Sequence, residues 1–269
     1  MEANVYRVDG SSEKKLTLPN VFMGAYNQDL IKRAILAEQS RRYQPQGHYL
    51  LAGMNTSAAY IGRYSTYRTY RHVGKPARPR QMLAKGAMGD VRRIPSAVKG
   101  KRAHPHMVEK KIMEKINRKE YAKALESAVA ATGNSALIKK NHVYGKDSFP
   151  IVVVSEIEKI RKTKELMKLL KVIGADKDIE KSHDPKTKAG NRRGSKKRYF
   201  RRSILIVAKN TEDIEKAGRN IPGVDILAVD RMSVEVLAPD AKPRLTLWSE
   251  AAISSLPGAI ASSVANYKQ

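Results

Sequence analysis

Residues 150–154 read Pro-Ile-Val-Val-Val, a run of β-branched side chains that predicts a strand buried on both faces. Thr163 is the expected cap of a helix that ends at Gly174. Residues 203–208 read Ser-Ile-Leu-Ile-Val-Ala and predict a second buried strand. Because such strands alternate with helices, the sequence predicts an α/β fold with a mostly parallel sheet flanked by helices.

The same alternation continues toward the C-terminal residues. A helix is predicted at about 211–219, a strand at 224–229, a short strand at 245–248 and a helix near 250–255. Trp248, the only tryptophan, falls in the alternating segment. We expect it to pack in the core or at an interface and not to stack on a nucleic-acid base.

Toward the N-terminal residues, an alternating segment at 5–8 predicts a strand, and Leu30, Ile31, Ala34 and Ile35 fall on one face of a predicted helix. Helical patterns also cover 108–116 and continue after Asn117 and Glu120. This Asn/Glu pair has the spacing of a capping box, and Gly133 is the expected end of that helix.

Residues 41–106 lack any such period, apart from a possible short element at 49–54. Fourteen basic residues there face one acid, Asp90, a net charge of +13, and six tyrosines (Tyr43, Tyr49, Tyr60, Tyr64, Tyr67 and Tyr70) lie among them. Aromatic residues are depleted in ordinary disordered segments, which favours a functional insertion over a solvated disordered loop. We therefore expect a globular domain formed by residues 1–40 and 107–269, with a long basic loop at 41–106 inserted after the first helix.

The charge of the chain indicates its partner. The 52 Lys and Arg against 26 Asp and Glu give a formal net charge of +26, which predicts a polyanionic partner. No apolar run approaches the roughly 20 residues of a membrane-spanning helix, and no secretory signal is recognisable. The absence of cysteine fits a reducing compartment, so we expect a cytoplasmic protein without a membrane partner.

Irregular RNA is bound by Lys and Arg on its phosphates and by aromatic rings on its unpaired bases, and the loop supplies both. A second basic tract at 181–202 carries a net charge of +9 and resembles another phosphate-binding surface, although such runs also serve as nuclear-localisation signals. The expected RNA-binding residues are Arg63, Tyr64, Tyr67, Arg68, Tyr70, Arg71, Lys75, Arg78, Arg80 and Lys85 in the loop, with Lys188, Arg192, Arg193, Lys196, Lys197 and Arg198 in the second tract.

Other chemistry has weaker support. The glycines and Ser195 of the second tract lack the GxxxxGK[ST] order of a phosphate loop. His104 and His106 have no third ligand nearby, which favours RNA contact or simple exposure over a metal site. The acids available near strand ends for hydrolysis are Glu156, Glu158, Asp225 and Asp230, at positions that carboxylates commonly occupy. We expect no catalytic residue, no metal and no cofactor.

Residues 92–106 read Arg-Arg-Ile-Pro-Ser-Ala-Val-Lys-Gly-Lys-Arg-Ala-His-Pro-His. This run closely resembles the loop exit of the large-subunit ribosomal protein four family in its archaeal and eukaryotic form. Leu-Glu-Ser-Ala-Val-Ala-Ala-Thr at 125–132, Asn-Ile-Pro-Gly-Val-Asp at 220–225 and Leu-Thr-Leu-Trp-Ser-Glu-Ala-Ala-Ile at 245–253 follow in the family's order. The resemblance covers essentially the whole chain.

The resemblance implies an α/β domain on the exterior of the large subunit, with an internal loop that penetrates the ribosomal RNA and supports assembly. Residues 62–75 would lie nearest the polypeptide exit tunnel, where the nascent polypeptide would be a partner, and the protein would contact neighbouring large-subunit proteins in a cytoplasmic, ribosome-bound state. Asp90 stands where the family often has a basic residue. By this resemblance the loop exit would contact RNA through Arg92, Arg93, Lys99, Lys101, Arg102, His104 and His106.

Three alternatives stay open from the residues alone. The first is an RNA-processing enzyme, a nuclease or methyltransferase, that uses the α/β sheet as its platform. The second is an architectural DNA-binding or regulatory protein, and the third is an additional role on the protein's own messenger RNA. For the free protein, we expect the α/β domain to fold and residues 41–106 to stay unfolded until RNA is bound.

Overall fold

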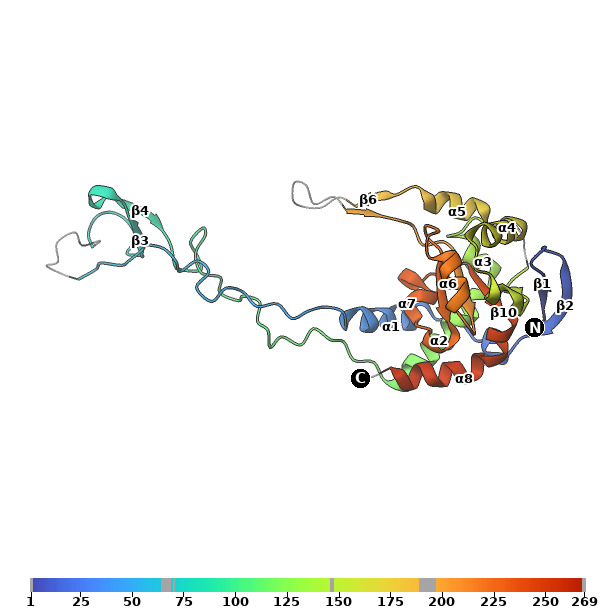
Figure 1. The fold of residues 1–269 in the computed structure, drawn as a ribbon. Helices are drawn as coiled ribbons and strands as arrows, with labels where there is room; N and C mark the ends of the chain where they lie inside the picture. Colours follow the sequence, from blue (N-terminus) through green and yellow to red (C-terminus); the bar gives the residue numbers. More distant parts are fainter. Residues whose placement is uncertain (1, 64–68, 70, 146–147, 189–196, 268–269) are drawn as a thin grey trace. The chain divides into compact units, whose positions relative to one another are not determined.

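The computed structural model describes residues 2–63, 69, 71–145, 148–188 and 197–267 (Figure 1). The chain divides into two compact units. Residues 1–41 and 114–269 form one, which we call the globular domain, and residues 42–113 form the other, which we call the insertion. None of the described helices is long and apolar enough to span a membrane.

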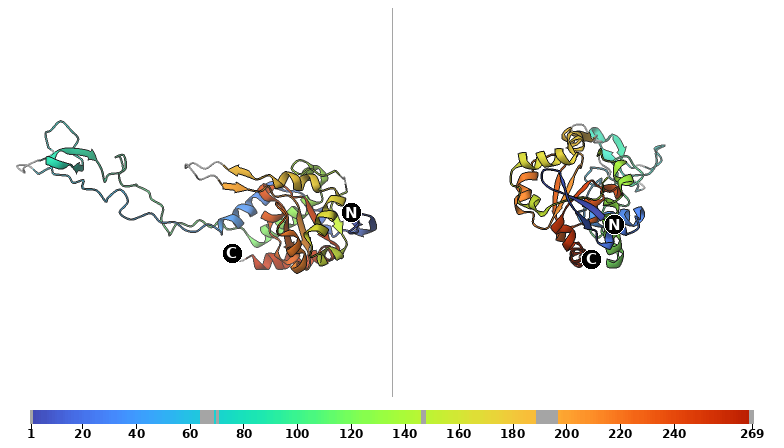
Figure 2. Two further views of the ribbon diagram at one scale, coloured as in Figure 1. Left: turned by 45° about the horizontal axis from the view of Figure 1, so that its top comes forward. Right: turned by 90° about the vertical axis from the view of Figure 1, so that its right-hand side faces the viewer.

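A six-stranded sheet forms the centre of the globular domain, and the helices lie on both of its sides (Figure 2). β1 and β2 pair antiparallel, whereas all the other neighbours are parallel, as the sequence predicted. The strands in spatial order are β2 (Ser12–Thr17), β1 (Glu2–Tyr6), β5 (Ile151–Val153), β10 (Thr246–Ser249), β8 (Leu205–Ala208) and β9 (Asp225–Ala228).

Two apolar clusters cover the two faces of this sheet. Val152, Val207 and Trp248 belong to one cluster, whereas their chain neighbours Val153 and Ile206 belong to the other. Successive side chains of a strand point to opposite faces, so a strand buried on both faces needs apolar residues at every position. This explains the uninterrupted runs in the sequence and places Trp248, which is fully buried, in the core.

The helices divide between these clusters. The first cluster draws on η1 (Asn20–Met23), α1 (Gln28–Ser40), α2 (Arg118–Thr132), η4 (Val229–Arg231), α7 (Val234–Leu237), η5 (Pro239–Ala241) and α8 (Glu250–Asn266). The second draws on α3 (Ser135–Lys139), η3 (Ser155–Lys159), α4 (Thr163–Ile173), α5 (Asp176–His183) and α6 (Glu212–Gly218).

Helix boundaries follow the predicted signals in part. The capping box of Asn117 and Glu120 is confirmed, and Gly174 ends α4 with a positive φ of 94°. Thr163 is the first helical residue and not the cap, which is Lys162 without a side-chain hydrogen bond. The first strand was predicted at 5–8 and lies at Glu2–Tyr6. The C-terminal helix continues past Pro257 to Asn266, well beyond the predicted end at 255.

The helix predicted at 108–116 is wrong. Residues 108–117 contain no helix, and both Val108 and Met113 are largely exposed. An apolar helix face formed by these residues would therefore have nothing to pack against. Without such packing, a short helix is only marginally stable in water. The predicted element at 49–54 is a series of turns.

The insertion contains a hairpin that no pattern in the sequence indicated. β3 (Arg80–Met82) pairs antiparallel with β4 (Met88–Val91), and η2 (Ala84–Gly86) connects the two. Ala59 and Arg80 exchange two backbone hydrogen bonds of 3.1 Å. Among the described residues of the insertion, Ala58 is the only buried hydrophobic side chain, so this unit has almost no core.

Candidate nucleic-acid interface

Gly53 lets the two limbs of the insertion lie close together, and Gly100 forms a tight turn within the second limb. A Cβ on Gly53, whose φ is 77°, would lie 2.4 Å from the carbonyl oxygen of Gly100, and a Cβ on Gly100 would lie 1.9 Å from that of Ile94. The backbones can approach this closely only because neither residue has a side chain. Elsewhere, the backbone N–H of His48 donates to the carbonyl of His106 at 3.1 Å.

The arginines at the loop exit have partners within the insertion. Arg92 donates from Nη1 to the carbonyl of Val98 at 2.6 Å and from Nη2 to Asp90 at 3.2 Å, and its side chain is only 15% exposed. Arg93 donates to the carbonyl of Ala58 at 3.1 Å. Both guanidinium groups therefore hold the backbone of the insertion, whether or not they also contact RNA.

Most of the predicted loop residues are presented to solvent. The exposed residues are Arg63, Arg71, Lys75, Arg78, Lys85, Lys99, Lys101, Arg102, His104 and His106, whereas Arg80 is half-buried in β3. Lys85 and Lys99 occupy positive φ angles of 59° and 58°, in tight turns that present their side chains outward. The predicted Tyr64, Tyr67, Arg68 and Tyr70 lie outside the described residues.

The second basic tract forms a hairpin of β6 (Lys186–Lys188) and β7 (Lys197–Tyr199), all of whose residues are exposed. Lys188 pairs with Lys197 and Lys186 with Tyr199, so each pair shares one face. Like charges opposite one another destabilise an isolated hairpin, and an anion between them relieves the repulsion. The predicted Arg192, Arg193 and Lys196 lie outside the described residues.

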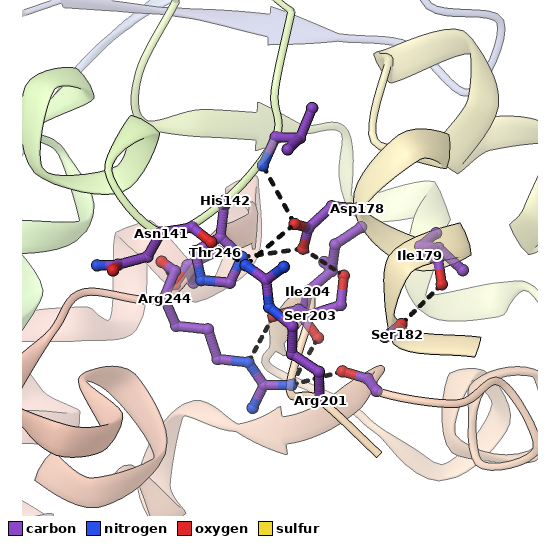
Figure 3. A network of polar contacts seen from close by, with 12 residues as sticks. Asn141, His142, Asp178, Ile179, Ser182, Arg201, Ser203, Ile204, Arg244 and Thr246 are labelled. Atoms are coloured by element: carbon purple, nitrogen blue, oxygen red, sulfur yellow. Dashed lines mark hydrogen bonds and ion pairs between the residues drawn. The ribbon is translucent and has the colours of Figure 1, made fainter. Parts of the chain in front are cut away.

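A buried polar network lies where this hairpin joins the sheet (Figure 3). The fully buried Asp178 accepts hydrogen bonds from Ser203 Oγ at 2.6 Å and from the backbone N–H of Val143 at 3.1 Å, and its Oδ2 lies 2.9 Å from His142 Nδ1. Burial acts to raise the pKa of Asp178, but these hydrogen bonds and the His142 charge outweigh it and hold the pKa below its ordinary value. Arg201 donates to the carbonyl of Asn141 and lies 3.8 Å from Asp178.

Arg244 completes the network at the amino ends of β8, β9 and β10. Its guanidinium is fully buried, donates to the carbonyls of Ser203, Ile204 and Gly223, and pairs with Asp225. Burial acts to lower the pKa of Arg244, and the Asp225 carboxylate opposes that effect. This multiple bonding compensates for the desolvation of the charge and fixes the edge of the sheet from which the basic hairpin leaves.

The opposite, carboxyl edge of the sheet is occupied by Glu158. Its carboxylate accepts from the backbone N–H groups of Lys209 and Asn210 at 2.9 and 3.1 Å, and from Ser249 Oγ at 2.6 Å. Ligands of open α/β sheets usually bind at this edge. In this protein the Glu158 carboxylate at that edge is hydrogen-bonded to groups of the fold itself. Among the described residues, no group of three or more His, Asp or Glu is arranged to hold a metal ion.

The globular domain fixes the two chain segments that border the insertion. Ser40 Oγ accepts from the backbone N–H of Glu114 at 2.9 Å. The Arg41 guanidinium lies 3.6 Å above the ring of Tyr267, which stacks on Tyr121 at 4.0 Å between centroids. We call this group of contacts the root clamp, because it holds both ends of the insertion within the globular domain.

Comparison with known proteins identifies the family. Residues 16–259 match the Ribosomal protein L4/L1 family. The chain belongs to this family. Curated relatives named "Large ribosomal subunit protein uL4" include that of Methanospirillum hungatei, which is 39% identical over 96% of this chain and 99% of the relative. Those of Methanococcus vannielii and Archaeoglobus fulgidus are 39% and 37% identical, each over 95% of this chain and 98% of the relative.

The region that matches the Ribosomal protein L4/L1 family contains both the insertion and the β6–β7 hairpin. Part of the basic surface lies beyond the predicted loop, in the segment for which a helix was predicted from residue 108 onward. A groove of about 540 Å³ in the insertion is lined by Arg42, Tyr43, His106, Lys110 and Lys111 among others. Lys110 and Lys111 beside Tyr43 have the same combination of basic and aromatic residues as the predicted loop. That combination is the sequence feature that could have indicated this part of the surface.

Proposed function

We propose that the chain is a structural constituent of the large ribosomal subunit, where it binds ribosomal RNA through the insertion and supports assembly. The observation that carries this proposal is the insertion itself, a unit with exposed cations and almost no apolar core. Such a unit cannot offset its conformational entropy and self-repulsion alone, whereas phosphates supply the opposite charge and release counterions on binding.

Within this function, the exposed loop cations bind phosphates, and the loop tyrosines stack on unpaired bases. The RNA-penetrating part comprises residues 41–106, and Lys110 and Lys111 extend it. The predicted residues of the second tract form a separate phosphate-binding surface on the globular domain.

The finer assignments follow from the family resemblance. Residues 62–75 lie nearest the exit tunnel and the nascent polypeptide, the exterior of the globular domain contacts neighbouring large-subunit proteins, and the subunit is cytoplasmic. The protein acts by neutralising and organising RNA and not as an enzyme.

The RNA-processing alternative is less favoured by the geometry. Asp225 begins β9 at the amino edge of the sheet and pairs with Arg244, whereas Glu158 lies at the carboxyl edge and caps backbone N–H groups. Each of these two carboxylates has a partner within the fold, which favours a structural role over a catalytic one.

Sedimentation of cell lysate through sucrose gradients tests the proposal, with the protein followed by mass spectrometry at physiological and at high salt. We expect near-stoichiometric migration with large subunits that survives the high-salt wash. Migration as a free species, or loss at modest salt, would contradict an integral subunit protein and favour an enzyme or regulator.

A further inference from the structure

A cleft of about 420 Å³ opens on the globular domain where β7 continues toward β8. We propose that this cleft binds one unpaired nucleotide of RNA, with the base against an aromatic wall and the phosphate on cations at the rim. This inference rests on the proposed function and adds a base-binding site outside the insertion. The residues that line this cleft include Tyr199, Phe200, Arg202, Lys242, His142 and Asp240.

The aromatic wall consists of two adjacent rings. Tyr199 is 48% exposed and Phe200 52% exposed, although each carries a large apolar surface. Both directly follow the basic residues Lys197 and Arg198, which are exposed. Exposed aromatic rings beside cations are the usual platform for unpaired bases, because every base has a face that can stack.

The cations at the rim can bind the phosphate of the same nucleotide. Lys242 is exposed at the cleft, and Arg202 is exposed while one of its amino groups lies 4.0 Å from Glu235 Oε1. Arg202 Nη1 also donates to the backbone carbonyl of Glu235 at 3.5 Å. Because a guanidinium carries five N–H donors and this side chain is 45% exposed, the remaining donors can reach a phosphate.

His142 lies at the inner side of the cleft and is held by the buried network (Figure 3). Since Asp178 engages Nδ1, the other ring nitrogen, Nε2, is the one available to a ligand. The Asp178 carboxylate thereby orients the imidazole, just as its contacts with Ser203 and Arg201 fix the chain that carries the aromatic wall.

The acids in the lining distinguish between ligands. Asp240 is exposed at the cleft, and Glu235, which is nearly buried and accepts a hydrogen bond from Gln39 at 3.2 Å, also lines it. Carboxylate oxygens accept hydrogen bonds from the exocyclic amino groups of adenine, cytosine and guanine, which uracil lacks. The cleft therefore favours a nucleotide whose base carries an amino group.

The test uses the full chain, with pentaadenylate and pentauridylate as probes at one fixed salt concentration. Ultraviolet irradiation cross-links stacked bases to aromatic residues, and mass spectrometry measures the yield of nucleotide adducts on the Tyr199–Phe200 peptide. The yield as a function of probe concentration gives an affinity for this site that is independent of binding to the insertion. We expect pentaadenylate to bind about fivefold more tightly than pentauridylate, the effect of one hydrogen bond.

Variants sharpen the test. Phe200→Ala should weaken pentaadenylate binding, measured by adducts at Tyr199, by about tenfold through the lost stack, whereas Phe200→Tyr keeps a ring and should retain it. Lys242→Ala should weaken binding several-fold, while Lys164→Ala, which removes an exposed lysine of α4, should not. Equal affinities for the two probes together with unaffected variants would overturn the proposal.

The same irradiation of purified large subunits separates this proposal from the proposed function. Nucleotide adducts on the Tyr199–Phe200 peptide within the subunit support the cleft. If the chain sediments with the subunit but Lys242 cross-links through an amine reagent to a neighbouring protein and the peptide carries no nucleotide, the cleft proposal fails and the proposed function stands. If the chain does not sediment with the subunit, the proposed function fails, and the pentaadenylate measurement still decides the cleft.

Discussion

The interactions that stabilise the globular domain differ from those within the insertion. In the globular domain, two apolar clusters cover both faces of one sheet, and Trp248 and Val152 are fully buried. In the insertion, turns, a short hairpin and the side chains of Arg92 and Arg93 hold the backbone. The globular domain is stabilised by the removal of apolar side chains from water. The insertion instead needs a partner that supplies negative charge.

Hydrogen exchange of the free protein should give the largest contrast. We expect backbone amides of β5, β8 and β10 to exchange only on global unfolding, and amides of β3 and β4 to exchange nearly unprotected, a difference in opening free energy of about 5 kcal/mol or more. Two-dimensional NMR or mass spectrometry would measure it. Protected amides throughout the insertion without RNA would remove the distinction between the two units.

Removal of the central aromatic residue should affect only one unit. Trp248→Ala leaves a cavity against Phe22, whose ring lies 5.5 Å away, and should lower the free energy of unfolding of the globular domain by about 3–5 kcal/mol. Chemical denaturation would measure it. The control Leu36→Ala removes a half-exposed side chain of α1 and should cost much less. A similar loss in both variants would mean that the first cluster is not the stabilising core.

The Asp178 network should make the globular domain sensitive to acid. Because the pKa of Asp178 is lowered in the folded state, its contribution is present above the ordinary Asp value, near 3.8, and is lost as the pH falls through the lower folded value. Asp178→Asn should cost about 3 kcal/mol at neutral pH and flatten this acid-dependent loss. Denaturation at a series of pH values tests both effects. The exposed Glu180→Gln is the control, and an unchanged pH profile in Asp178→Asn would exclude this assignment.

Loss of cations from the insertion should alter RNA binding and leave stability unchanged. The triple variant Lys99→Ala/Lys101→Ala/Arg102→Ala should reduce the slope of log affinity against log salt by about 2. Filter binding to large-subunit RNA over a salt series would measure it. The matched control removes three exposed lysines of α4, Lys164, Lys168 and Lys171, and should keep the slope. Equal slopes in both triple variants would mean that charge alone, and not the insertion, determines binding.

The sequence predicted the globular domain well, because its signals are local. Uninterrupted apolar runs at 151–154 and 204–208 mark strands buried on both faces, and Asn117 with Glu120 marks a helix start within four residues. The predicted helix at 108–116 was wrong because its formation depends on contacts that are not local. Its spacing is helical, but periodicity cannot reveal that Val108 and Met113 have nothing to pack against.

The sequence predicted which residue types form the candidate interface, but not how those residues are arranged in space. Arg, Lys and Tyr in one loop indicated RNA, but the β6–β7 hairpin has no apolar period, and its pairing of Lys188 with Lys197 is visible only in the structure. The same holds for His142, Asp178 and Ser203, which are far apart in the sequence and meet at one edge of the sheet. Such contacts depend on the topology of the whole domain.

The root clamp has a consequence for biosynthesis. Arg41 is translated early, whereas its partner Tyr267 follows every other element of the globular domain. Domains fold during translation as their segments emerge, and contacts between distant residues form last. The Ser40–Glu114 hydrogen bond can form as soon as residue 114 has left the ribosome, whereas the Arg41–Tyr267 contact must wait until α8 has been made. The growing chain therefore carries the basic insertion with only part of its clamp closed while residues 115–267 are synthesised.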